Sequence, residues 1–99
     1  MLKHIVMWKL KEENKSENAQ KIKAMLEALP GIIPQIKSLA VGIDIGADAA
    51  GSYDACLITT FDDTAALEIY QNHPEHKKVA AFVATVRENR AVVDFESNA

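Results

Sequence analysis

The hydrophobic and polar residues of this chain follow two different periods, and each period predicts one kind of secondary structure. Four segments rich in β-branched and aromatic residues are typical of strands, and three others place apolar residues three and four positions apart, as helices do. The predicted strands are residues 3–11, 38–45, 53–61 and 90–96, and the predicted helical segments are residues 19–29, 62–72 and 73–89. The resulting order is β-α-β-β-α-β, with the second helical region in two pieces.

Capping and turn residues mark the ends of the predicted helices. Asn14 or Ser16 can cap the first helix, and the pair Pro30–Gly31 ends it. Pro74 suits the first position of the last helix, which makes His73 its expected N-cap. The apolar stripes of these two helices consist of Ile22, Met25, Leu26 and Leu29, and of Val79, Phe82, Val83 and Val86.

This order of elements is typical of the ferredoxin-like split βαβ plan. The plan predicts an α+β fold with a four-stranded antiparallel sheet in the strand order 4-1-3-2 and the helices on one face. The length of 99 residues fits a single domain over residues 1–99. The other sheet face would expose apolar residues such as Ile5, Met7, Cys56 and Ile58. We therefore expect a second copy to cover this face and form a homodimer.

Charge and composition argue against several classes of protein. The net charge is −3 and the lysines are interleaved with acidic residues, which argues against nucleic-acid binding. No apolar run approaches the roughly 20 residues of a membrane span, and the N-terminal stretch is not typical of a signal peptide. Cys56 is the single cysteine and is expected to be a small buried hydrophobe. These features favour a cytoplasmic protein.

The segment YQNHPEH, residues 70–76, contains the best candidates for catalysis. His76 precedes Val79 and Val83 by three and seven residues, so its ring is expected to point toward the sheet. The helix N-terminus and apolar burial both disfavour the charged imidazolium, and a neutral imidazole suits a general base. Tyr70 could donate a hydrogen bond to an enolate oxygen. Alternatively, His76 satisfies a backbone carbonyl and Tyr70 is a core residue.

A second pair of candidates comes from the first and last strands. In the predicted strand order these strands are antiparallel neighbours, so His4 and Asp94 could meet. The carboxylate would then orient the ring, or the pair would be an ion pair at the sheet edge. Val6, Trp8 and Val83 are expected to line the same pocket. The histidine spacing does not match a zinc site.

Several stretches of the chain resemble the stress-responsive α/β-barrel (Dabb) family. They are HIVMWKLK, LPGIIPQIKSLAVGID, SYDACLITTFDD and ALEIYQNHPEHKKV, and the resemblance covers roughly residues 3–95. The most specific part is the Tyr-x-x-His-Pro-x-His run. Proteins of this family are dimers whose two sheets close into a barrel, so the resemblance implies a dimeric α/β barrel.

The resemblance also implies roles for particular residues. One plant branch of the family is a cofactor-free polyketide cyclase that performs an aldol condensation on a linear tetraketide. Its catalytic tyrosine and histidine match Tyr70 and His76, and two further residues match His4 and Asp94. Two positions depart from that branch: Ala55 replaces a histidine of the third strand, and Met25 or a neighbour replaces a tyrosine of the first helix.

Some plant members of the family hold magnesium on main-chain carbonyls after the first helix. The matching positions are Pro30, Ile33 and Ile36. Carbonyls at a helix C-terminus suit a hard cation, although no carboxylate side chain lies in the segment LPGIIPQIK. The resemblance thus implies a weak magnesium site and no other cofactor.

Three functions are compatible with the sequence. The first is a dimer that binds a small carbonyl or aromatic metabolite between sheet and helices, with cofactor-free cyclase-type or lyase-type proton transfer as a further step. The second is a non-catalytic stress-response or interaction protein. The third is an antibiotic-biosynthesis-type monooxygenase on the same barrel, which the Tyr-x-x-His-Pro-x-His run favours less than the stress-responsive family.

Overall fold

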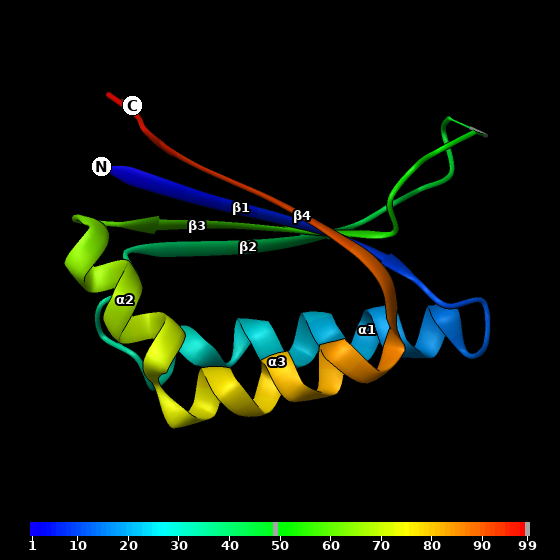
Figure 1. Cartoon of the computed structure of the whole chain (residues 1–99), viewed down its shortest axis with the longest axis horizontal. Coiled ribbons are helices and arrows are strands. Elements are labelled where there is room, and N and C mark those ends of the chain that lie inside the picture. The colour runs from blue at the N-terminus through cyan, green and yellow to red at the C-terminus, as the bar shows by residue number, and fades with distance from the viewer. Residues whose placement is uncertain (49, 99) are drawn as a thin grey trace.

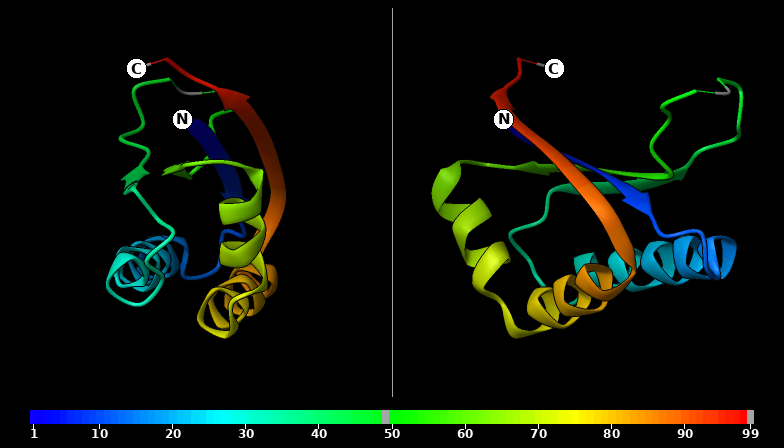
Figure 2. Two further views of the ribbon diagram at one scale, coloured as in Figure 1. Left: turned by 90° about the vertical axis from the view of Figure 1, so that its left-hand side faces the viewer. Right: turned by 45° about the vertical axis from the view of Figure 1, so that its right-hand side comes forward.

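The computed structural model describes residues 1–48 and 50–98 and contains one sheet with helices against one of its faces (Figure 1). The strands are β1 (Leu2–Leu10), β2 (Ser38–Ile43), β3 (Ala55–Phe61) and β4 (Arg87–Glu96). The helices are α1 (Lys15–Glu27), α2 (Thr64–Asn72), α3 (Pro74–Val86) and the short 3-10 helix η1 (Leu29–Gly31). The two long helices α1 and α3 lie side by side below the sheet, and α2 descends from one end of it (Figure 2).

The sheet confirms the predicted ferredoxin-like plan. Its four strands run in the order β2-β3-β1-β4, and every neighbouring pair is antiparallel. The central strand β1 places His4 between Thr59 of β3 and Asp94 of β4. Because side chains alternate along a strand, His4, Val6 and Trp8 all face the helices.

The core lies between the inner sheet face and the helices. Buried residues of β1 and β3 meet the apolar stripes of α1 and α3, which the sequence predicted. Each fully buried large aliphatic or aromatic side chain contributes about 1.5–3 kcal/mol to stability. The members with almost no exposed surface include Val6, Leu10, Ile22, Leu29, Ile33, Leu57, Phe61 and Tyr70. Met25, Phe82 and Val86 are only partly buried at the edge of this core.

The first and last helices have different bounds from those predicted. α1 begins at Lys15, four residues before the predicted start at residue 19, and Asn14 is its N-cap without a side-chain capping bond. α3 ends at Val86, although the prediction extended this helix to residue 89. The reason for the early end is the sheet: the Lys11 N–H donates to the Val86 carbonyl at 2.9 Å, and Arg87 already pairs with β1.

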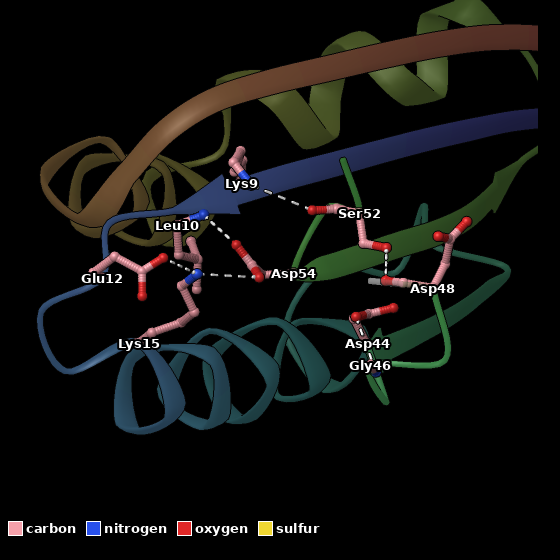
Figure 3. Close-up of polar contacts among 9 residues, drawn as sticks. All are labelled: Lys9, Leu10, Glu12, Lys15, Asp44, Gly46, Asp48, Ser52 and Asp54. Carbon is pink, nitrogen blue, oxygen red and sulfur yellow. Dashed lines mark hydrogen bonds and ion pairs between the residues drawn. The ribbon is translucent and has the colours of Figure 1, made fainter. Parts of the chain in front are cut away.

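The hairpin of β2 and β3 also has shorter strands than predicted. β2 ends at Ile43, so Ile45 lies in the connecting loop with 89% of its surface exposed rather than on the buried face. β3 begins at Ala55, and the backbone of Asp54 before it still bonds to both neighbouring strands: its N–H donates to the Trp8 carbonyl at 2.8 Å, and its carbonyl accepts the Asp44 N–H at 2.9 Å. The Asp54 carboxylate accepts the Leu10 N–H at 2.7 Å and lies 3.5 Å from the Lys15 ammonium (Figure 3). Asp54 therefore ties three elements together.

Side-chain caps start α2 and α3. Asp63 accepts the Ala66 N–H at 2.9 Å at the start of α2. His73 accepts the Glu75 N–H at 3.1 Å through Nδ1, which confirms its predicted role as the N-cap of α3. The extended backbone of His73 separates the two helices, so α3 begins in a new direction below the sheet.

The outer sheet face retains apolar residues that are largely exposed in the single chain. Met7, Ile58, Val93 and Phe95 are among them. Cys56 is half-buried on this face and not in the core, since the strand alternation points Leu57 inward instead. Within residues 1–48 and 50–98, no helix combines the length and hydropathy needed to cross a bilayer.

Candidate functional site

A cavity of about 270 Å³ lies between the inner sheet face and the helices α2 and α3. Six of the seven residues predicted for the pocket line it, and the seventh, Asp94, contacts one of them. The six are His4, Val6, Trp8, Tyr70, His76 and Val83. The structure thus brings together residues from β1, α2 and α3 that lie as many as 79 positions apart in the sequence (83 − 4 = 79).

His76 lies in the first turn of α3, on the side that faces the cavity. Its Nδ1 is 3.2 Å from the carbonyl oxygen of Gln71. A carbonyl only accepts hydrogen bonds, so we assign the proton of the neutral ring to Nδ1. This tautomer leaves the lone pair of Nε2 free. The backbone bond therefore fixes the ring and gives it the form that a general base requires.

The surroundings of His76 favour its neutral state. Burial lowers its pKa below the ordinary 6.5, and the bond to Gln71 opposes this effect only in part. Electrostatic repulsion from the nearby Arg90 and from the side chains of His4 and His73 lowers the pKa of His76 further. A histidine with a lowered pKa is predominantly neutral at pH 7.

Tyr70 is the last buried residue of α2 and has no exposed surface. Burial raises its pKa to about 12, so its hydroxyl keeps its proton at neutral pH. That hydroxyl has no hydrogen-bond partner among the residues that the structure describes. The centroid of its ring lies 4.3 Å from that of His76 and 5.1 Å from that of Phe61. Tyr70 lines the cavity, and a protonated hydroxyl without a partner is a donor that a ligand brought against it can satisfy.

His4 and Asp94 form the contact that the antiparallel pairing of the first and last strands predicted. His4 Nδ1 lies 2.5 Å from Asp94 Oδ1, and the His4 side chain is 3% exposed against 41% for Asp94. The carboxylate orients the ring with Nδ1 toward solvent-accessible Asp94. The centroid of the His4 ring lies 6.3 Å from that of Tyr70, and His4 lines the same cavity.

Two arginines that the sequence argument did not include also line the cavity. They are Arg87 and Arg90, at the start of β4. Arg90 could have been found, because strand alternation places it on the same face as Asp94 in the predicted strand 90–96. Arg87 could not, since the apolar stripe continued the predicted helix across it.

The predicted magnesium position lies in the turn after α1. The carbonyl oxygen of Ile33 accepts the Ile36 N–H at 3.2 Å, and both side chains are buried. The ligand set, with Pro30, consists of uncharged carbonyls, which bind divalent cations weakly without a carboxylate. Within the described residues, no three or more His, Cys, Asp or Glu side chains cluster as metal ligands. The magnesium site stays a prediction.

Comparison with known proteins identifies similar chains that align with this one over most of their length. The family model "Stress responsive A/B Barrel Domain" matches residues 2–97. A dimeric protein of unknown function with a ferredoxin-like fold from Bacteroides fragilis is 32% identical, with 97% of this chain and 95% of that chain covered and a TM-score of 0.88. A dimeric ferredoxin-like protein of unknown function from Thermobifida fusca is 29% identical, with coverages of 97% and 90% and a TM-score of 0.87.

A hydroxynitrile lyase from Passiflora edulis has the same fold. It is 23% identical to this chain, with 98% of this chain and 93% of that chain covered and a TM-score of 0.85. At this identity the likeness concerns the fold. No curated protein matches the chain.

Proposed function

Because the chain belongs to the stress responsive A/B barrel domain family, we propose that it binds a small carbonyl or aromatic metabolite in the cavity between its sheet and helices. We propose further that His76 and Tyr70 perform cofactor-free proton transfer on that ligand. One observation carries the proposal: the imidazole of His76 and the phenol of Tyr70, whose hydroxyl has no partner among the described residues, lie side by side at the same cavity. A base beside a hydrogen-bond donor is what abstraction of a proton next to a carbonyl requires.

The proposed step moves one proton and one electron pair. The C–H bond next to the ligand carbonyl breaks, and the proton passes to Nε2 of His76. The electron pair forms the C=C bond of an enolate, and negative charge develops on the carbonyl oxygen. Tyr70 donates its hydroxyl hydrogen bond to that oxygen. Such a donor stabilises the developing charge most strongly in an apolar site, where water does not compete.

The size of the cavity limits the ligand. Ligand pockets are commonly about 300–1,000 Å³, so a cavity of about 270 Å³ suits a ligand with one ring or a short chain. Its walls include Val6, Trp8 and Val83, which offer apolar contact to a ring. His4 presents Nε2 to the same space, because Asp94 holds its other nitrogen.

Proton abstraction can be tested without knowledge of the natural ligand. Acetophenone in deuterated buffer should exchange its methyl protons faster with the wild-type protein than with buffer alone, as followed by proton NMR. His76→Gln should abolish the acceleration, and Tyr70→Phe should reduce it. Lys77→Gln, at an exposed neighbour of His76 outside the cavity, is the matched control. Exchange at the same rate in wild type and His76→Gln would contradict the proposal.

We also propose that the chain forms a homodimer through the outer sheet face. Met7, Ile58, Val93 and Phe95 lie on the three strands β1, β3 and β4 of that face and are each 40% exposed or more in the single chain. Exposed apolar surface on this scale commonly marks an interface. The related proteins from Bacteroides fragilis and Thermobifida fusca are described as dimeric, which supports this assembly.

A non-catalytic role is the second candidate, and one observation favours it. Both cavity histidines already have hydrogen-bond partners within the protein. The His76 ring bonds to the Gln71 carbonyl, and the His4 ring bonds to the Asp94 carboxylate. In that case the protein binds a ligand without transforming it, or it functions as a dimer in a non-catalytic interaction. The exchange experiment separates the two functions, since binding by itself does not accelerate loss of a methyl proton.

A further inference from the structure

The two arginines of this chain both lie at the cavity. The chain has eleven basic residues, of which Arg87 and Arg90 are the arginines and the rest are lysines. None of the lysines lines the cavity, whereas both arginines do. The concentration of guanidinium groups at one place therefore contrasts with a net charge of −3 for the whole chain.

The pairing of β4 with β1 places these arginines on the inner side of the sheet. Arg90 is opposite Trp8, and Arg87 is opposite Leu10, with a bulge between the two pairs. Trp8 and Leu10 are both buried residues of the inner face. Since opposite residues of a strand pair point to the same face, both arginines extend over the end of the cavity near the C-terminus of α3.

Neither guanidinium is neutralised by the protein within residues 1–48 and 50–98. The acidic side chains in ion pairs are matched by lysines, by the N-terminus or by His4, and neither Arg87 nor Arg90 takes part. Arg87 is half-buried and Arg90 is exposed at the rim. A half-buried cation without a counter-ion beside an apolar cavity favours an anionic ligand.

The two ends of the cavity would then contact different parts of one ligand. His76 lies in the first turn of α3, and Arg87 follows its last residue. Eleven residues of helix correspond to about 16 Å of backbone rise. The long arginine side chains can extend over part of this distance, so the gap between the guanidinium and imidazole groups is smaller than the rise. Arg90 is near enough for its charge to act on His76. Because His76 and both arginines line the same cavity of about 270 Å³, a single-ring ligand in it can contact both kinds of group.

We propose that the natural ligand carries a carboxylate, which Arg87 and Arg90 bind, in addition to the carbonyl group that Tyr70 and His76 contact. The ligand class is thus a small keto acid or an aromatic acid with a carbonyl substituent. The planar guanidinium matches the two oxygens of a carboxylate. This inference rests on the proposed function for the carbonyl end and is independent of it for the carboxylate end.

Matched probes test the carboxylate end. Binding of para-acetylbenzoate and of its uncharged amide, para-acetylbenzamide, is measured by isothermal titration calorimetry at about pH 7.5, where the acid is ionised. The wild type should bind the acid about tenfold more tightly than the amide, as expected for one charge-assisted hydrogen-bonded contact. Arg90→Gln and Arg87→Gln should each reduce this preference, and the double variant should abolish it with amide binding unchanged. Lys77→Gln should preserve the preference.

The outcomes separate this inference from the proposed function. Equal affinity for acid and amide in the wild type would overturn the carboxylate site. If Tyr70→Phe then weakens the binding of both probes, the proposed function still holds. A preference for the acid that requires the arginines, with no effect of Tyr70→Phe, would support the carboxylate site and contradict the carbonyl role. Tighter binding of para-acetylphenyl phosphate than of the acid would overturn the choice of carboxylate. Binding of neither ketone would overturn both proposals.

Discussion

The phenol ring of Tyr70 and the imidazole of His76 lie with their centroids 4.3 Å apart at an angle of 50°, across the bend between α2 and α3. The bend exists because His73 ends one helix and caps the next, and Pro74 begins the new one. The short segment between the two residues thus brings a buried hydroxyl and a neutral base into one cavity. The cap residue His73 has a structural role, whereas Tyr70 and His76 of the same motif line the cavity.

Tyr70→Phe should separate stability from function. The buried hydroxyl has no partner among the described residues, and a buried polar group without a partner costs about 1–3 kcal/mol. We therefore expect the variant to be as stable as the wild type or more stable by about 1 kcal/mol, as urea denaturation will show. Accelerated methyl exchange should fall by roughly a hundredfold or more, as for loss of an oxyanion donor. A large loss of stability would indicate that the hydroxyl is bonded in solution.

His76 should make stability depend on pH in slightly acidic solution. Burial lowers its pKa below 6.5, so between that lowered value and pH 6.5 the unfolded chain binds more protons than the folded chain. The free energy of unfolding then rises with pH through this window and falls as the solution becomes more acidic. The difference in unfolding free energy between wild type and His76→Gln, measured by urea denaturation at several pH values, isolates the effect. A difference that is independent of pH would contradict it.

The same shift sets the lower pH limit of the proposed proton transfer. Methyl exchange should stay on a plateau at neutral pH and decline only when His76 gains a proton, at a pH below 6.5. The decline is measured as the exchange rate against pH, with Lys77→Gln as control. A midpoint above 6.5 would show that His76 is charged more easily in the folded chain than its burial implies.

Replacement of Asp54 should lower the free energy of unfolding more than replacement of an exposed polar residue in the same loop. Its carboxylate accepts the Leu10 N–H and approaches Lys15, and its side chain is only 18% exposed (Figure 3). Asp54→Ala leaves a backbone donor at the end of β1 without its partner, so we expect a loss of about 1–3 kcal/mol of unfolding free energy. Asp48→Ala, in the exposed part of the same loop, should stay within about 0.5 kcal/mol. Equal effects of the two changes would show that Asp54 does not hold the hairpin.

The apolar residues of the outer sheet face should determine whether the chain is a dimer or a monomer. We expect the wild type to sediment as a dimer at low micromolar concentration, and Ile58→Lys to sediment as a folded monomer, because a lysine at the centre of an apolar interface is costly to bury. Ile45→Lys changes a residue that is 89% exposed in the loop and should leave the dimer intact. A folded wild-type monomer under these conditions would contradict the proposed homodimer.

The sequence by itself determined the elements, their order and the plan of the sheet. The strand period and the helical stripes follow from backbone geometry and from burial of one face, which are local properties of each segment. The cap at His73 and Pro74 is local as well. The contact of His4 with Asp94 followed from the plan, since antiparallel neighbours in that strand order bring these two positions together.

Only the tertiary structure decided where one element ends and which side chains share the cavity. Arg87 leaves the helix because the Lys11 N–H and the pairing with β1 hold that part of the chain in the sheet. The helical stripe alone assigns Arg87 to the helix. For this reason the sequence did not identify Arg87 as a residue of the cavity. Likewise, Ile45 continues an alternating pattern but lies exposed in the loop, just beyond Asp44, whose N–H still donates to the Asp54 carbonyl of the hairpin. These outcomes depend on contacts between distant segments, which local periodicity does not contain.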